Sequence, residues 1–109
     1  MAPILTIDVS GEMFNKYNRR GRAKYRKVWF NRELDRMSWG VSRHPKPVLV
    51  KGFIDTHDIE TITLGTKGSK DNHRSFTVVT DKRTVNLEAS DIATRDKWVT
   101  AINFVVDSM

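Results

Sequence analysis

The side chains with the clearest chemical potential in this sequence are cations concentrated in one third of the chain. Residues 16–51 contain twelve lysines and arginines but only two acids, whereas the remaining residues carry seven basic and eleven acidic side chains. The formal net charge of +6 is therefore unevenly distributed. Such polarity orients a protein toward an anionic partner and speeds their encounter. The pattern predicts binding of phospholipid headgroups, nucleic acid or an acidic protein.

Residue patterns typical of catalysis or metal binding are absent from the sequence. It has no cysteine, and its three histidines, His44, His57 and His73, lack the spacing of a metal-ligating motif. It also lacks a GxSxG nucleophile motif and a phosphate-cradling glycine loop. The group formed by Asp55, His57 and Asp58 is better explained as a polar turn between strands. We therefore expect no enzyme activity, no cofactor and no metal site.

Targeting signals are likewise absent from the sequence. Its apolar runs are far shorter than the roughly 20 residues of a membrane-spanning helix. The first eight residues lack a charged n-region and a long apolar h-region. Position 2 is Ala2 rather than the glycine that N-myristoylation requires. We expect a cytoplasmic protein.

Short β-branched and aromatic runs predict about seven strands to carry these cations. Gly40 is expected to end the third strand, and Pro45 and Pro47 predict a loop over 42–47. Gly52 indicates a bulge in the fourth strand. The expected strands are 12–17, 24–30, 34–39, 48–54, 59–64, 75–80 and 84–88.

The pattern changes to helical spacing near the C-terminus. Ser90 and Asp91 are suited to cap a helix. Beyond them an apolar stripe predicts a helix that covers one end of a bent barrel; its members are Trp98, Ala101, Ile102 and Val105. The length of 109 residues suits one domain over 1–109. We expect its core at about 11–106, with 1–10 an N-terminal extension that packs beside the barrel.

This order of elements resembles the pleckstrin homology (PH) domain family. Trp98 stands where that family has its helix tryptophan, and residues 74–88 are similar to its sixth and seventh strands. Lys16, followed by a basic pair before Val28-Trp29-Phe30, resembles the family's phosphoinositide-binding signature. Within the family, the PH domains of delta-type phospholipases C look most similar, because Trp39 is followed by Ser42, Arg43 and His44. The resemblance implies a mainly β fold, a bent seven-stranded antiparallel barrel or sandwich capped by one C-terminal α-helix.

The resemblance also implies a non-enzymatic membrane-targeting module on the cytosolic face of a membrane. Its partner would be an anionic phospholipid, a phosphoinositide first and phosphatidic acid as the alternative. Arginine grips phosphate with two parallel donors, and lysine acts as a mobile point charge. The pocket is expected between the 18–22 turn and the 42–47 loop. Its candidate residues are Lys16, Arg19, Arg20, Arg22, Lys24, Arg26, Lys27, Arg43, His44 and Lys46.

Several alternatives stay open at the level of sequence. Lys24, Arg26, Val28 and Phe30 share one face of the second strand and Lys27 the other, and a one-residue slip would exchange them. A protein partner is the alternative to lipid, because the same superfold serves peptide-binding modules. Nucleic acid is not expected, since the aromatic residues do not form an exposed stacking set.

Two further groups of cations are expected to be only solvated, away from any site. They are Arg32, Arg36 and Lys51 at strand edges and Arg74, Lys82 and Arg83 near the last hairpin.

Overall fold

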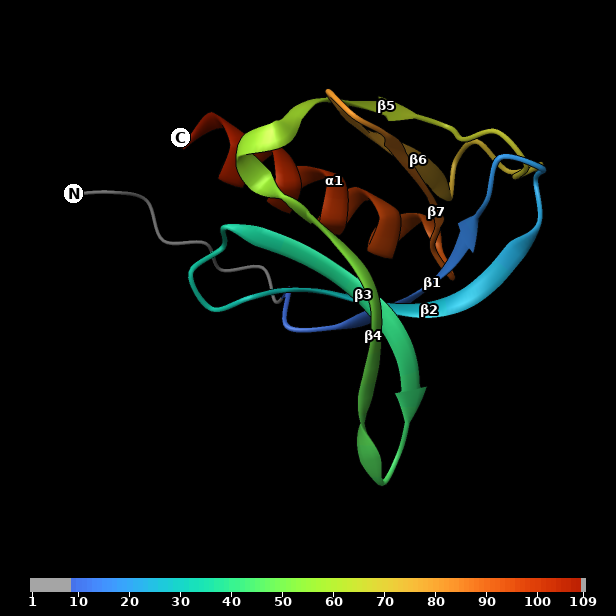
Figure 1. Cartoon of the computed structure of the whole chain (residues 1–109). Helices are drawn as coiled ribbons and strands as arrows, with labels where there is room; N and C mark the ends of the chain where they lie inside the picture. The colour runs from blue at the N-terminus through green and yellow to red at the C-terminus, as the bar shows by residue number, and fades with distance from the viewer. Residues whose placement is uncertain (1–8, 109) are drawn as a thin grey trace.

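The computed structural model describes residues 9–108 and is mostly β (Figure 1). The expected extension at residues 1–10 lies largely outside the described residues. Val9 and Ser10 are described, and Val9 is buried with its carbonyl accepting from Phe30 N. The elements are β1 (Glu12–Tyr17), β2 (Ala23–Phe30), β3 (Arg36–Arg43), β4 (Lys46–Asp55), η1 (Thr56–Asp58), β5 (Ile59–Leu64), β6 (Ser75–Thr80), β7 (Thr84–Glu88) and α1 (Ile92–Asp107).

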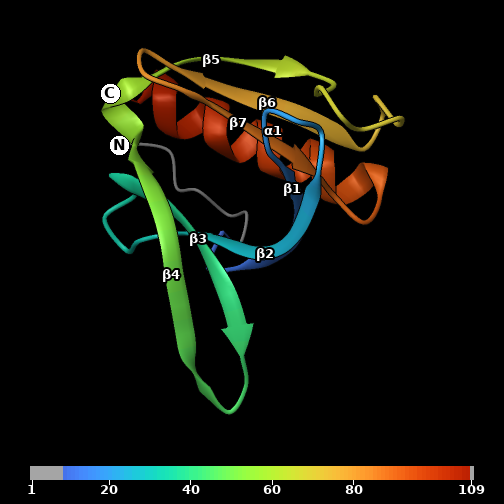
Figure 2. The same ribbon diagram turned by 45° about the vertical axis from the view of Figure 1, so that its right-hand side comes forward.

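Within residues 9–108, the seven strands form one antiparallel sheet in the order β4-β3-β2-β1-β7-β6-β5. Pairing of β1 with β7 joins the first and last strands of the chain, so the sheet is continuous from β4 to β5. The sheet curves strongly, and α1 lies along its β5–β7 half in both views (Figures 1 and 2). This arrangement confirms the predicted architecture of seven strands and a C-terminal helix.

Aromatic side chains join the helix to the sheet at the centre of the core. Trp98 of α1 is fully buried, and its ring centroid lies 5.3 Å from that of Phe14 and 6.1 Å from that of Phe30. Phe14 also packs edge-on against Phe76 at 5.9 Å. Phe14 and Phe30 come from β1 and β2, so the helix stripe fastens the strands that carry the basic residues. Trp98 is thus a core residue.

The helix begins where its cap was predicted. Asp91 has extended backbone angles, and its carboxylate accepts a hydrogen bond from Thr94 N at 2.7 Å. This bond satisfies one of the amide groups that a helix leaves free in its first turn. One turn further on, the buried Arg95 donates to the carbonyls of Asn72 and Ser75 and so ties α1 to the end of the β5–β6 loop.

The third and fourth strands are longer than predicted. Gly40 does not end β3, which continues to Arg43 and pairs with β4 down to Lys46. Gly40 lies directly against the Leu49 carbonyl, where a side chain would not fit, so this glycine permits a tight irregularity in the pairing. Pro47 is tolerated because β4 is an edge strand. The predicted 42–47 loop is therefore mostly strand.

Leu34 was also predicted as the first residue of the third strand, and this prediction is wrong. Its backbone has a positive φ of 60°, and Leu34 N donates to Asn31 O at 3.0 Å in a turn. Arg36 N then donates to the side chain of Asn31, so this asparagine organises the turn and delays the strand by two residues.

Candidate functional site

Two cavities open on either side of Lys16 at the end of β1. The first, about 280 Å³, is called here the β2 cavity and is lined by Lys16, Asn18, Arg22, Lys24, Arg26, Trp39 and Lys51. The second, about 630 Å³, is called the β7 cavity and is lined by Lys16, Tyr17, Asn18, Arg19, Arg83, Thr84 and Asn86. Together they bring seven cations and no acid to one region of the described chain.

Lys16 reaches the junction of the cavities because it shares the inward face of β1 with Phe14. Phe14 is buried, and two residues later the same face emerges from the core. The Lys16 ammonium lies 5.0 Å from the centroid of the Trp39 ring, and the Arg83 guanidinium lies 5.1 Å from it. Both distances are within the range of cation–π attraction. Trp39 therefore holds a cation from β1 and another from the β6–β7 turn.

Gly52 of β4 leaves room for the ring of Trp39, which lies on the neighbouring strand β3. The two residues are paired across β3 and β4, and a Cβ on Gly52 would lie 2.7 Å from Trp39 Cζ2. A larger residue would push against the ring. Gly52 thus keeps the flat platform under Lys16 and Arg83, and its expected bulge is seen as a pairing shift between Trp39 and Gly40.

The electrostatics of the site favour an anion. Burial lowers the pKa of the Lys16 ammonium below its ordinary value, and the charges of Arg83, Arg26 and Lys24 lower it further. An ammonium in such surroundings lacks a counter-charge, so a phosphate placed in either cavity would relieve the repulsion among the cations.

The register of β2 decides between Arg26 and Lys27. Phe14 is paired with Arg26 and Lys16 with Lys24, so these residues lie on the face that carries buried Val28. Lys27 lies on the opposite face, directly against Gly11. Of the two, Arg26 lines the β2 cavity.

Asn18 shapes the turn between β1 and β2. Its side-chain oxygen accepts hydrogen bonds from Arg20 N at 2.9 Å and Arg22 N at 3.0 Å, and its carbonyl accepts from Gly21 N at 3.0 Å. Gly21 has a positive φ of 76°, a conformation that glycine adopts without strain. The turn places Arg19 in the β7 cavity and Arg22 in the β2 cavity, whereas Arg20 lines neither.

The remaining predicted site residues lie elsewhere. Arg43, His44 and Lys46 are exposed at the tip of the β3–β4 hairpin and line neither cavity. Both views show this hairpin projecting away from the β1–β2 turn (Figures 1 and 2). Arg43 instead donates from Nε to the carbonyl of Pro47 at 3.1 Å. The wall that these three residues were expected to form is supplied by other side chains.

The side chains that sequence reasoning did not assign to the site are Lys51, Arg83, Trp39, Asn18, Tyr17, Thr84 and Asn86. Lys51 and Arg83 were expected to be only solvated. Lys51 lies one residue from the glycine under Trp39, and Arg83 closes a short turn before β7.

Two absences apply to residues 9–108. No group of three or more His, Cys, Asp or Glu side chains is arranged to hold a metal ion there. No helix in that range is long and apolar enough to cross a membrane.

Comparison with solved structures identifies the fold as that of a pleckstrin homology domain. The PH domain of human oxysterol binding protein-related protein 11 matches with a TM-score of 0.70 and 22% identity, over 90% of this chain and 79% of that chain. The C-terminal PH domain of pleckstrin, in complex with D-myo-Ins(1,2,3,5,6)P5, matches with a TM-score of 0.70 and 20% identity over 90% of this chain and 94% of that chain.

A structure of PLC21 from S. officinalis also matches, with a TM-score of 0.70 and 10% identity, over 90% of this chain and 15% of that chain. No protein-family model matches the sequence, and no curated protein matches it either. At these identities the likeness establishes the fold, and the finer resemblance to delta-type phospholipases C stays a prediction.

Proposed function

We propose that this chain is a membrane-targeting module that binds the phosphorylated headgroup of an anionic phospholipid, most favourably a phosphoinositide, in the cavities that flank Lys16. One observation carries the proposal. Lys16 is partly buried among other cations, and none of the carboxylates within residues 9–108 lines the cavities around it. The module needs no catalytic group, and it would act as a peripheral protein on the cytosolic face of a membrane.

The chemistry of the lining side chains suits a phosphomonoester. Such a group carries close to two negative charges and three strong acceptor oxygens. Arg22 and Arg26 in the β2 cavity and Arg83 in the β7 cavity offer paired N–H donors, while Asn18 and Thr84 add neutral polar groups. Each basic residue near an anionic leaflet contributes about 1 kcal/mol. Seven such residues, with losses, are consistent with micromolar affinity, about −8 kcal/mol.

The solved relative bound to an inositol pentakisphosphate supports the same ligand class here, since the two chains share a fold. Phosphatidic acid is the second candidate lipid, because its exposed monoester suits the same cations. A protein partner is the remaining alternative and becomes an outcome of the test.

The test is co-sedimentation with liposomes at about 0.15 M salt, where long-range attraction is screened beyond roughly 8 Å. Vesicles of matched charge would carry phosphatidylserine, phosphatidic acid or a single phosphoinositide, with soluble inositol phosphates as competitors. The proposal predicts preference for a phosphoinositide and displacement by inositol phosphates. Preference for phosphatidic acid would select the second lipid. Equal, salt-sensitive binding to all vesicles would contradict a specific headgroup site and favour a protein partner.

A further inference from the structure

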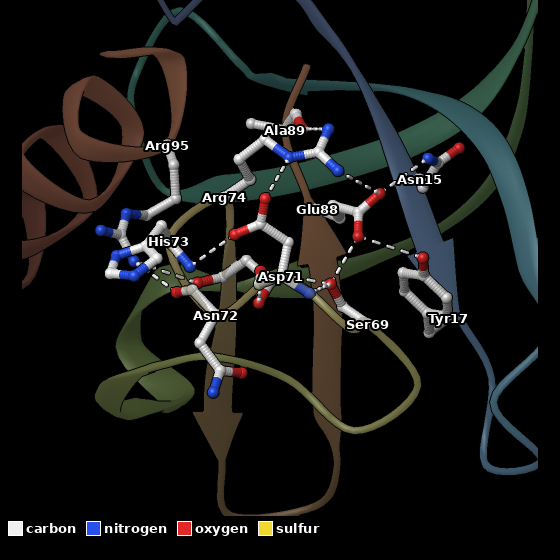
Figure 3. A network of polar contacts seen from close by, with 11 residues as sticks. Asn15, Tyr17, Ser69, Asp71, Asn72, His73, Arg74, Glu88, Ala89 and Arg95 are labelled. Atoms are coloured by element: carbon white, nitrogen blue, oxygen red, sulfur yellow. Dashed lines mark hydrogen bonds and ion pairs between the residues drawn. The ribbon is translucent and has the colours of Figure 1, made fainter. Parts of the chain in front are cut away.

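One buried carboxylate fastens the β5–β6 loop (residues 65–74) to the middle of the sheet (Figure 3). Glu88, at the end of β7, is only 7% exposed. Its Oε1 accepts a hydrogen bond from Asn15 Nδ2 at 3.1 Å, and its Oε2 accepts from Tyr17 Oη at 3.2 Å and from the Ser69 hydroxyl. Arg74 Nη2 lies 3.9 Å from Oε1. Glu88 thus connects β1 to Ser69 in the middle of the loop and to Arg74 at its end.

The loop is also tied internally around Asp71. The Asp71 carboxylate pairs with Arg74 Nε at 2.8 Å and accepts from His73 N at 2.9 Å, and Asp71 N donates to the Ser69 hydroxyl at 3.1 Å. These bonds join Ser69, Asp71, His73 and Arg74 into one hydrogen-bonded unit, drawn together in Figure 3. A hydrogen bond that fixes Ser69 therefore also restrains the other residues of this unit.

The loop touches the β1–β2 turn through two glycines. Gly68 has a positive φ of 99°, and a Cβ at this position would lie 3.0 Å from Gly21 Cα and 2.7 Å from Tyr17 Cδ1. The backbone of Gly68 thus packs directly on the backbone of Gly21, and the Tyr17 ring lies beside this contact. Because Ser69 follows Gly68, the bond from Ser69 to Glu88 positions this contact.

The charge of Glu88 runs counter to the charge of the proposed site. Burial raises the pKa of this carboxyl, but hydrogen bonds from Ser69, Asn15 and Tyr17 lower it by more, so the net shift is downward and the group is ionised at neutral pH. By charge alone, a carboxylate behind a cationic site weakens anion binding. A contribution to binding must therefore come from the positions that it holds.

We propose that Glu88 is a positioning residue for the headgroup site: it holds Gly68 against Gly21 and so fixes the turn that carries Asn18, Arg19 and Arg22 into the cavities. This inference rests on the proposed function for its effect on binding. Its structural part, the restraint on the turn, concerns the unliganded protein and is measured separately.

The experiment compares Glu88→Ala, Glu88→Gln and Ser69→Ala with wild type in affinity for soluble inositol trisphosphate and in amide exchange at Gly21 and Arg22. Electrostatics alone predicts that Glu88→Ala binds more tightly. Positioning predicts binding about three- to tenfold weaker, because preorganisation is lost, with faster exchange at both amides. Glu88→Gln, whose carbonyl still accepts from Ser69 and Tyr17, should recover affinity to within about twofold of wild type. Glu60→Ala, an exposed acid on β5, is the matched charge control and should not weaken binding.

Ser69→Ala keeps the Glu88 charge and carries the test if Glu88→Ala fails to fold; it should weaken binding and speed exchange in the same direction. Folded Glu88→Ala or Ser69→Ala that binds at least as tightly as wild type, with unchanged exchange at Gly21, would overturn the inference. If wild type binds no inositol trisphosphate but exchange still rises in the variants, the restraint on the turn stands and the proposed function fails.

Discussion

The ammonium of Lys16 lies 5.0 Å from the centroid of the buried Trp39 ring. Lys16 is on β1 and Trp39 on β3, and β2 lies between these strands in the sheet. Arg83 lies in the β6–β7 turn, in the other half of the curved sheet, and its guanidinium is 5.1 Å from the centroid of the same ring. The site is thus assembled around one aromatic platform from segments far apart in the sequence.

Lys16→Ala should lower the affinity for inositol trisphosphate by about tenfold, because a charge-assisted hydrogen bond of about 1.5 kcal/mol or more is lost. Calorimetric titration measures the effect. Arg32→Ala is the control, since Arg32 is exposed in a turn and lines neither cavity. Equal affinities for the two variants would contradict the role of Lys16, as would a collapse of Tm in Lys16→Ala.

Arg83→Ala should weaken the same binding by about fivefold, the equivalent of about 1 kcal/mol, although the sequence alone predicted little effect. The neighbouring Lys82→Ala removes the same charge from a side chain that lines neither the β2 nor the β7 cavity. A difference between the two variants measures geometry rather than net charge. Equal losses would show that only the charge of the β6–β7 turn matters.

Arg26→Ala and Lys27→Ala form a second matched pair, on adjacent residues of β2. Arg26 lines the β2 cavity and Lys27 lies against Gly11 on the other face. We expect Arg26→Ala to lose most of the affinity for phosphoinositide vesicles and Lys27→Ala to retain it. The reverse order in co-sedimentation would mean that β2 presents its other face to the lipid.

Binding should weaken with rising pH earlier than ordinary lysines titrate. The pKa of Lys16 is lowered in the free protein, and a bound phosphate favours the ammonium and raises that pKa. Affinity is therefore highest at pH values below the pKa that Lys16 has in the free protein, and it falls as pH rises through that pKa. Between the pKa of Lys16 in the free protein and its pKa in the complex, binding takes up a proton. Calorimetry in buffers of different ionisation enthalpy measures this uptake. Affinity that stays constant until exposed lysines titrate would refute the coupling.

Asp91→Ala should lower Tm by several degrees, because Thr94 N loses its hydrogen-bond acceptor. That hydrogen bond holds the pKa of Asp91 below its ordinary value, so its contribution to stability is complete above the unfolded-state pKa and is lost as pH falls through the folded-state pKa. Asp91→Asn keeps a cap oxygen without this titration. The difference in Tm between wild type and Asp91→Asn should therefore shrink as pH falls below the unfolded-state pKa of about 3.9; a difference that does not change with pH would disprove the assignment.

Local sequence patterns predicted most of the fold because the spacing of apolar residues indicates which face of a strand or helix is buried. The last hairpin has the predicted strands, Ser75–Thr80 and Thr84–Glu88, since alternating β-branched residues face the core there. Trp98 and its stripe predicted the helix for the same reason. The strand ends predicted from Gly40 and Pro47 are wrong because a glycine at a pairing irregularity and a proline on an edge strand are compatible with a strand.

The residues of the site were predictable only where the alternation of faces along a single strand determines their position. Lys16, Lys24 and Arg26 continue the inward face of β1 and β2, so the two-residue period placed them. Arg83 meets Trp39 only because β7 pairs with β1, a contact between residues far apart in sequence. Arg43 and Lys46 depend on the direction of a projecting hairpin, which no local pattern specifies (Figure 2).

The most direct test of the central claim is an NMR titration of the ¹⁵N-labelled protein with soluble inositol trisphosphate at about 0.15 M salt. The account predicts saturable shifts centred on the amides of Lys16, Arg26 and Arg83 and on the Trp39 indole, with little change at Arg43 and Lys46. Shifts confined to the β3–β4 hairpin tip, or shifts that never saturate, would contradict a headgroup site around Lys16.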